Sequence, residues 1–315
     1  MKNLFKRKNV VLAADGVTQI KSKREKDNSP VFTIVVASIL IIYLISLAFP
    51  LWWALVTSLR IPYEFQMQQV VFMPEFTEGW GDNYIYAIMV GYRVQRTVFP
   101  WDYIYIESMI PNTIIYTIGS TLAITMSCCV TAYCSVQFSR FRISKVYTTL
   151  VYIVIALPIV GAEAASLQMY MNVGFYDSLF GMILGKTSFL NTYYLIFHEA
   201  FKAVPKDYAE AAYIDGAGNL NLFVRLMFPF VSKTFLTVAL IFFITYWNEY
   251  QVPLLYMPNY PTLAYGLQVY TGSSANTAPP RLFAGCMVLF IPIFTFFCVF
   301  HKRLLGNLML GGVKE

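Results

Sequence analysis

The sequence predicts an all-α membrane protein with six transmembrane helices, on the evidence of its composition, its apolar runs and its distribution of basic residues. Hydrophobic residues make up 57% of the 315 residues, and charged residues only 13%. Soluble domains are typically about 45–50% apolar and about 25% charged. A chain with so little charge cannot cover a folded surface with polar groups, so lipid must solvate much of that surface.

Apolar runs of sufficient length locate the helices, because a helix needs about 20 apolar residues to cross the hydrocarbon core. Residues 1–30 are mostly polar and precede the first run. A cleavable signal peptide instead has a short basic stretch before a core of about 7–15 apolar residues. Residues 1–30 are therefore predicted to be a tail in front of a true span. The predicted transmembrane helices cover residues 31–55, 108–138, 146–171, 179–201, 229–251 and 282–300.

The fourth predicted helix, 179–201, is the one that hydropathy alone would discard, because it contains Lys186, His198 and Glu199. Lysine and arginine concentrate on the cytoplasmic side of membrane proteins. With six helices, 18 of the 23 basic residues fall in the segments on one side of the membrane and 5 on the other. Without the fourth helix the split is nearly even. The charge distribution therefore favours six helices, with the N-terminal tail and the C-terminal tail, 301–315, both in the cytoplasm.

Two external loops differ in character. Residues 60–107 are rich in tyrosine and tryptophan as well as in acids. Aromatic residues near the ends of helices usually form belts at the membrane interface, and the alternative is a small folded cap or a docking surface for an external partner. Residues 257–281 are rich in proline, glycine and serine, which predicts an irregular loop.

The cytoplasmic loop 202–228 is predicted to contain a short helix. Pro205 can start it, and Asp207 and Glu210 are acids of the kind that helix N-termini favour. Gly216 and Gly218 predict its end. A short helix of small residues that lies between two transmembrane helices has the form of an element that fits into a groove of another protein.

The spacing of residues in this loop resembles the EAA motif of ABC importer permeases. In that family an EAA triplet is followed after three residues by glycine, and after nine more by I-x-L-P. Leucine and phenylalanine replace the isoleucine and leucine here, and both are apolar. The matching residues are Glu210-Ala211-Ala212, Gly216 and Leu226-Met227-Phe228-Pro229. The longer string EAAYIDGA, Trp247-Asn248-Glu249-Tyr250 and Ile291-Pro292 are similar to the MalG/LplC-like permeases of carbohydrate importers.

The resemblance implies a type I ABC importer permease fold with a cytoplasmic coupling helix, in the bacterial cytoplasmic membrane. The implied partners are a second permease subunit in a heterodimer, a cytoplasmic ATPase dimer, an external sugar-binding protein and membrane lipid, but no nucleic acid. The chain itself would need no cofactor, because ATP and Mg are used by the ATPase. The residues implied in ATPase coupling are Glu210, Ala211, Ala212, Asp215, Gly216 and Ala217.

Polar residues inside the predicted helices are candidates for the sugar pathway. Charged groups within a membrane are expensive and usually face a cavity or a partner, and sugars bind to aromatic faces, amides and carboxylates. For Glu163 the alternative is a structural bond to a neighbouring helix, and for the others it is a belt at the helix end. The candidates are Glu163, Tyr246, Trp247, Asn248, Glu249 and Gln251.

No catalytic or metal site is predicted. A P-loop requires four residues between its glycines, whereas Gly181 and Gly185 are separated by three. The five cysteines lie in apolar runs without metal-ligand spacing and are predicted to be small buried residues. The alternative function is an ion- or proton-coupled secondary carrier that uses Glu163, Glu199 and Glu249, but such carriers have inverted repeats, and none is evident.

Overall fold

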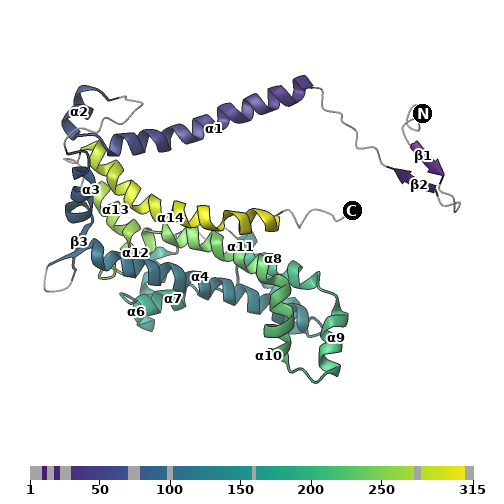
Figure 1. Cartoon of the computed structure of the whole chain (residues 1–315). Coiled ribbons are helices and arrows are strands. Elements are labelled where there is room, and N and C mark those ends of the chain that lie inside the picture. The colour runs from purple at the N-terminus through teal and green to yellow at the C-terminus, as the bar shows by residue number, and fades with distance from the viewer. Residues whose placement is uncertain are drawn as a thin grey trace. The chain divides into compact units, whose positions relative to one another are not determined.

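The computed structural model describes residues 9–12, 18–21, 30–69, 79–97, 102–157, 161–272 and 278–308 (Figure 1). The chain divides into two compact units, Met1–Trp53 and Ala54–Glu315. In the first unit, strands β1 (Asn9–Leu12) and β2 (Thr18–Lys21) pair antiparallel. Helix α1 (Pro30–Ser58) begins in the first unit and ends in the second. The rest of the predicted tail 1–30 lies outside the described residues, as do residues 309–315.

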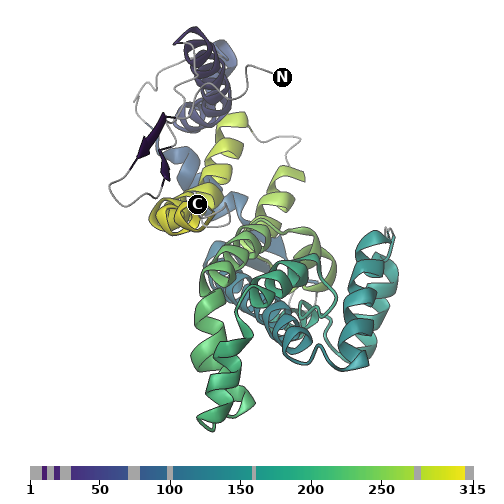
Figure 2. The same cartoon turned by 90° about the vertical axis from the view of Figure 1, so that its right-hand side faces the viewer.

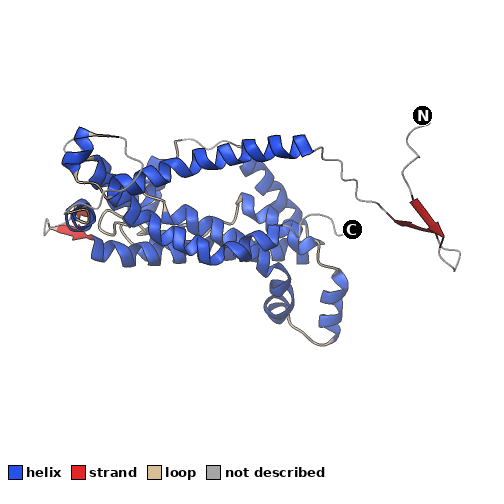
Figure 3. Ribbon diagram, turned by 45° about the horizontal axis from the view of Figure 1, so that its top comes forward, coloured by secondary structure: helices blue, strands red, loops and turns tan. Residues whose placement is uncertain are grey.

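The second unit is built almost wholly of helices (Figure 3). The loop 60–107, which the sequence predicts to be external, contains α2 (Pro62–Met67), α3 (Asp82–Tyr86), the π-helical turn η1 (Ala87–Gly91), β3 (Arg93–Gln95) and β4 (Tyr103–Tyr105). The following helices are α4 (Ile106–Gln137), α5 (Arg142–Ala156), α6 (Glu163–Val173), α7 (Leu179–Gly185) and α8 (Thr192–Lys202). Then come α9 (Lys206–Ile214), α10 (Asn219–Asn221), η2 (Leu222–Met227), α11 (Phe228–Trp247), α12 (Gln251–Tyr256), α13 (Leu263–Gly272) and α14 (Pro279–Leu308).

Among the described residues, four helical stretches are long and apolar enough to cross a membrane: Phe32–Ser58, Ile106–Gln137, Asn219–Trp247 and Pro279–Val299. The third and fourth predicted spans are not continuous helices. Residues 146–171 divide between α5 and α6, and residues 179–201 divide between α7 and α8. Helices α7 and α8 each begin at a side-chain cap, since Ser178 accepts from the Gly181 amide and Asn191 accepts from the Tyr193 amide. Such caps favour a new helix start. Asn191 lies inside the predicted span 179–201, and Ser178 directly precedes it.

Helix α4 is the central element of the second unit and packs against α7, α8 and α11. Its buried residues include Tyr116, Cys128 and Cys129. At Gly119 an added Cβ would lie 2.6 Å from the Ile183 side chain of α7. Glycine at this position therefore permits the close helix approach that packing in membranes favours. The prediction that all cysteines are buried was wrong for Cys134 and Cys298, which are exposed, and Cys286 is only half-buried.

The described residues of the aromatic loop 60–107 pack against the rest of the second unit. The Asn83 side-chain amide donates to the backbone carbonyls of Ser58 at 2.9 Å and of Arg60 at 2.7 Å. The buried Tyr92 hydroxyl donates to the Gly285 carbonyl of α14 at 2.7 Å. These bonds join the loop to the end of α1 and to α14. Burial raises the pKa of Tyr92 above its usual range because it disfavours the charged phenolate.

The second external loop, 257–281, is not irregular throughout, because it contains α13. The Thr262 hydroxyl accepts from the Tyr265 amide at 3.3 Å, and the Leu263 amide donates to the Thr113 hydroxyl of α4 at 2.8 Å. Thr262 and Leu263 are both buried. Capping and burial thus form a helix in a segment whose composition predicts a loop; residues 273–277 lie outside the described part.

The loop with the EAA motif, 202–228, and the aromatic-rich loop, 60–107, lie at opposite ends of the second unit. Helices α9 and α10 lie at one end, and α2, α3 and β3 lie at the other (Figure 1). Viewed after a quarter turn, the long helices of this unit are seen nearly end-on, with the α9 region at the edge (Figure 2). The helices α4 and α11 run between the two ends, so a shift of either helix can transmit movement from one end to the other.

Candidate functional site

Two helix breaks meet in the second unit and carry opposite charges. Lys186 is the residue directly after α7, and Glu249 lies in the three-residue gap between α11 and α12. Irregular backbone at membrane depth is tolerated where it is buried in protein or lines a water-filled cavity. Broken helices also form the substrate sites of many transporters. The two breaks are therefore a candidate position for substrate contact.

The charged groups of these breaks form an ion pair. The Lys186 ammonium nitrogen lies 2.8 Å from Oε1 and 3.0 Å from Oε2 of Glu249. The side chains are 16% and 20% exposed, respectively. Among ion pairs between described residues, this is the one in which both partners are mostly buried. A buried pair needs further hydrogen bonds to offset its loss of hydration.

Helix α4 supplies the additional hydrogen bond, because the buried Tyr116 hydroxyl donates to Oε2 of Glu249. The Lys186 nitrogen also lies 4.9 Å from the centroid of the Tyr246 ring. The rings of Tyr116 and Tyr246 pack edge to face with centroids 6.1 Å apart. The ammonium is thus held by a carboxylate and by an aromatic face, and a cation over an aromatic ring is favourable. We call Tyr116, Lys186, Tyr246 and Glu249 the charged cluster.

The structure brings two of the predicted pathway residues into this cluster, Tyr246 and Glu249. Trp247 points elsewhere: it is buried, and its indole donates to the Leu289 carbonyl of α14 at 3.2 Å. Asn248 is exposed and donates to the Ile244 carbonyl at 2.8 Å.

The remaining predicted pathway residues, Gln251 and Glu163, are exposed. Glu163 starts α6, and its backbone carbonyl accepts from the Tyr256 hydroxyl of α12 at 3.2 Å. Gln251 is the first residue of α12, and Glu163 is bonded to the end of the same helix. Neither residue belongs to the charged cluster.

Sequence reasoning missed the roles of Lys186 and Tyr116. Lys186 entered only through the charge count and the imperfect P-loop. The available signal was that an ionisable residue inside a membrane helix almost always pairs with another, and Glu249 was the acid of the next long helix. Nothing in the spacing of Tyr116 distinguished it from the other aromatic residues of an apolar helix.

The loop 202–228, predicted to be cytoplasmic and called the cytoplasmic loop from here on, contains the short helix that the sequence predicts, α9. This helix is closed by a turn at Gly216. Gly216 has a φ of +81°, which side chains other than glycine rarely adopt. The Gly216 amide donates to the Tyr213 carbonyl at 3.0 Å, and the Ala217 amide donates to the Ala212 carbonyl at 2.9 Å. This pair of bonds is a Schellman motif, which satisfies the last carbonyls of a helix. Glycine is therefore required here by backbone geometry.

The outer face of the cytoplasmic loop is exposed and partly apolar. Ile214 is 86% exposed and Leu220 is 76% exposed. Glu210 and Ala211 are also exposed, whereas Ala209 is buried. Large exposed apolar groups at the polar end of a membrane protein indicate an interaction surface.

A cavity of about 480 Å³ lies between α9 and the end of α4. Its lining includes Arg140 from the α4–α5 turn and Glu210 from the EAA triplet. At the same place the Gln137 side chain donates to the Tyr213 hydroxyl at 3.0 Å, and Tyr213 donates to Asn219 Oδ1 at 2.7 Å. The cytoplasmic loop is thus bonded directly to α4, the helix that carries Tyr116.

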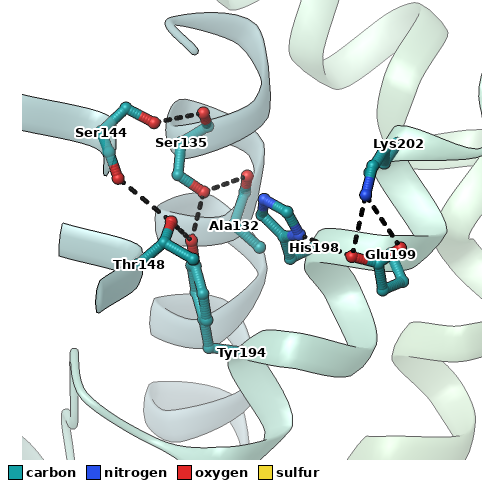
Figure 4. Close-up of polar contacts among 8 residues, drawn as sticks. All are labelled: Ala132, Ser135, Ser144, Thr148, Tyr194, His198, Glu199 and Lys202. Atoms are coloured by element: carbon teal, nitrogen blue, oxygen red, sulfur yellow. Dashed lines mark hydrogen bonds and ion pairs between the residues drawn. The ribbon is translucent and has the colours of Figure 1, made fainter. Parts of the chain in front are cut away.

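A second polar network joins α4, α5 and α8 just before the cytoplasmic loop (Figure 4). The buried Tyr194 hydroxyl donates to the Ser135 hydroxyl at 2.6 Å and lies 2.9 Å from the Thr148 hydroxyl. On the exposed side of α8, Glu199 lies between His198, at 3.1 Å, and Lys202, at 3.4 Å. Because α8 leads into α9, this network fixes the start of the cytoplasmic loop against two other helices.

Comparison with known proteins identifies a family and a fold. The family of binding-protein-dependent transport system inner membrane components matches residues 115–307. The diacetylchitobiose uptake system permease protein NgcG of Streptomyces coelicolor is 23% identical over 89% of this chain and 88% of its own length. The probable starch degradation products transport system permease protein AmyC of Thermoanaerobacterium thermosulfurigenes is 26% identical over 65% of this chain and 74% of its own.

A solved structure has the same fold. It is a chain of a bacterial ABC transporter involved in the import of the acidic polysaccharide alginate. The TM-score is 0.69 at 18% sequence identity, over 87% of this chain and 98% of that one.

Proposed function

The chain belongs to the family of binding-protein-dependent transport system inner membrane components, and from that membership we propose that it conducts a carbohydrate. As a member of this family it is a multi-pass membrane permease subunit of an ABC importer, and the family is not one of catalytic enzymes. The observation that carries the proposal is the family match across 115–307, which includes the exposed helix α9.

The carbohydrate cargo is supported by the relatives and by the chemistry of the chain. Both curated relatives described above are named for the transport of saccharides. The charged cluster and the exposed amides of Asn248 and Gln251 offer donors and acceptors suited to sugar hydroxyls. We propose that the cluster and these amides contact the sugar as it passes, and that Glu163 lies beside the same route.

Transport energy would come from a separate cytoplasmic ATPase dimer that binds the cytoplasmic loop. The exposed side chains of Ile214 and Leu220 would seat in a groove of the ATPase, with Glu210, Ala211 and Ala212 along the inner edge. Closure of the ATPase pair would then move α9, and the bonds from Tyr213 and Tyr194 would pass this movement to α4 and α5. A ligand that biases one of two states of such an element is sufficient to drive the change.

The remaining subunits follow from the same proposal. A second permease subunit would complete the pathway, and an external binding protein would deliver the sugar to the end that carries α2, α3 and β3. The end that carries α9 would face the cytoplasm, as would both chain termini. The excess of basic residues on this side supports that orientation.

An experiment on α9 tests the proposal. The chain is co-expressed with its cognate second permease and ATPase, and ATP-dependent uptake is measured in proteoliposomes that contain the binding protein. Ile214→Asp places a charge on the most exposed apolar side chain of α9, and we expect ATPase co-purification and uptake to fall together at least tenfold. Gln95→Asp, on β3 at the opposite end, introduces the same charge as a control and should preserve ATPase binding.

The alternative function, an ion-coupled carrier, makes the opposite prediction. Glu249 would be a coupling group in such a carrier, but it is paired with Lys186, and the family match disfavours this mechanism. Uptake by Ile214→Asp that is independent of the ATPase, and that is lost only when a proton uncoupler is added, would contradict ATP-driven import.

A further inference from the structure

The charged cluster has no formal net charge, and this bears on which saccharides can pass. We propose that this permease favours uncharged saccharides over acidic ones, and that Glu249 is the residue that enforces the preference by engaging the ammonium of Lys186. The inference rests on the proposed carbohydrate function and deepens it to a substrate class. It concerns the permease itself, in addition to any selection by an external binding protein.

The ammonium of Lys186 is already bound by other side chains of this protein. Both carboxylate oxygens of Glu249 lie within 3.0 Å of it, and the ring of Tyr246 covers it at 4.9 Å. Glu249 is itself oriented by the Tyr116 hydroxyl. An acidic sugar could bind the ammonium by displacing a carboxylate that is already held by a second donor, or by taking the third ammonium donor beside that carboxylate, where like charges repel.

Burial makes that displacement costly. Lys186 and Glu249 are only 16% and 20% exposed, so their charges are weakly screened by water. A sugar carboxylate that took the ammonium would also lie beside the displaced carboxylate of Glu249, and like charges at such a distance repel. The adjacent helix α6, which packs on α12, adds the exposed acid Glu163 and no lysine or arginine.

An uncharged saccharide meets neither difficulty. Its hydroxyls can donate to remaining lone pairs of the Glu249 carboxylate and accept from the third donor of the Lys186 ammonium without breaking the ion pair. The exposed amides of Asn248 and Gln251 flank Glu249 in the sequence and provide further donors and acceptors. The site should therefore bind saccharides through their hydroxyl groups and bind saccharides with a net negative charge more weakly.

Removal of the negative partner should reverse the preference. In Glu249→Gln the ammonium of Lys186 would be unneutralised, so the site would gain a positive charge. In the double variant Lys186→Met with Glu249→Gln, the site would again have no net charge. Glu199→Gln is the matched control, because it makes the same chemical change at an exposed residue of α8 that is 63% exposed.

The experiment measures equilibrium binding to the purified permease–ATPase complex in nanodiscs, without binding protein. The probes are maltotriose and diacetylchitobiose, which are uncharged, and trigalacturonate, which is acidic. We expect the wild type to bind at least one uncharged probe tenfold or more tightly than trigalacturonate. Glu249→Gln should reduce this ratio at least tenfold, and the Glu199→Gln control should keep the wild-type ratio. The double variant, which has no unneutralised ammonium, should give a ratio closer to the wild type than Glu249→Gln does.

Two results would overturn the inference while leaving the carbohydrate function intact. One is a wild type that binds trigalacturonate as tightly as the uncharged probes, a result that needs no variant to fold. The other is an assembled Glu249→Gln complex whose ratio stays within twofold of the wild type, which would make the ion pair a purely structural link. A complex that binds none of the probes, and a complete transporter that imports none of them, would overturn the carbohydrate proposal together with this inference.

Discussion

The side-chain amide of Gln137, the last residue of α4, donates a 3.0 Å hydrogen bond to the hydroxyl of Tyr213 on α9. Tyr213 in turn donates to Asn219 at 2.7 Å. One tyrosine therefore connects the helix of the cytoplasmic loop both to the end of α4 and to the start of α10. Because α4 also carries Tyr116, this bond lies between the proposed ATPase surface and the charged cluster.

Removal of the Tyr213 hydroxyl should weaken the link without unfolding the chain. Tyr213 is 41% exposed, so Tyr213→Phe should lower the free energy of unfolding by about 1 kcal/mol or less. We expect the complex to assemble and to hydrolyse ATP, with uptake per ATP reduced several-fold. Sugar uptake and ATP hydrolysis are measured on the same proteoliposomes.

Tyr208→Phe is the control for this variant, since Tyr208 lies on the same helix and packs its ring against Phe230 at 5.4 Å between centroids. If both tyrosine variants keep the wild-type ratio of uptake to hydrolysis, the bond from Gln137 is not part of the coupling path.

The left-handed backbone of Gly216 predicts a sharp difference between two glycines of the same loop. Gly216→Val forces a branched side chain into a conformation that costs an L-residue about 1–2 kcal/mol, and it should unravel the end of α9. Gly218→Ala is the matched control, because Gly218 has a φ of −75° and no atom within 4 Å of an added Cβ.

ATPase co-purification is the measurement for the two glycine variants, and it should fall severalfold for Gly216→Val alone. Equal losses in both variants would mean that the loop needs flexibility at both positions and not one left-handed residue.

Much of the fold could be predicted because local signals agreed. Apolar length located the four long helices among the described residues, and Gly216 marked the end of α9. The charge asymmetry kept the segment 179–201, which the structure divides into α7 and α8. The breaks within 146–171 and 179–201 were missed. In the second of these segments, Asn191 acts as a cap only when the flanking backbone turns away from the helix. Hydropathy averages over a window and cannot detect such a turn inside an apolar run.

The site was only half predictable for a related reason. Tyr246 and Glu249 stood out because they are close in sequence, and their partners Lys186 and Tyr116 come from helices 63 and 133 residues away from Glu249. Pairings at that separation depend on how the helices pack. Proximity in sequence also misleads: Tyr246 belongs to the charged cluster, whereas the indole of the adjacent Trp247 donates to a carbonyl of α14.

The ion pair itself should show a non-additive effect on stability. Lys186→Met leaves an uncompensated carboxylate in a mostly buried position, which typically costs about 3–5 kcal/mol. The double variant with Glu249→Gln removes both charges and should recover a large part of that loss. Thermal unfolding of the purified complex at one lipid composition measures this, and simple additivity of the two single effects would show that the charges do not interact.

The hydroxyl of Tyr194 should contribute to stability rather than to sugar selection. Tyr194 is fully buried and its hydroxyl donates to Ser135, so Tyr194→Phe leaves the buried Ser135 hydroxyl of α4 without this donor. The expected cost is about 1–3 kcal/mol, seen as a lower Tm with unchanged preference among saccharides. Tyr152→Phe on α5, at a residue 54% exposed, is the control and should keep the wild-type Tm.

The contact between α4 and α7 offers a test with a built-in rescue. Gly119→Ala would place a Cβ 2.6 Å from the Ile183 Cδ1 atom, and overpacking of this kind typically costs about 1–3 kcal/mol. The shortest contact is with the far end of one side chain, so Ile183→Val, which removes that atom, should restore part of the loss in the double variant, while Cγ1 and Cγ2 stay at 3.1 and 3.2 Å. Because Lys186 directly follows α7, we also expect Gly119→Ala to reduce uptake and the double variant to recover it. A double variant no more stable than Gly119→Ala alone would mean that the helices meet through other atoms than these.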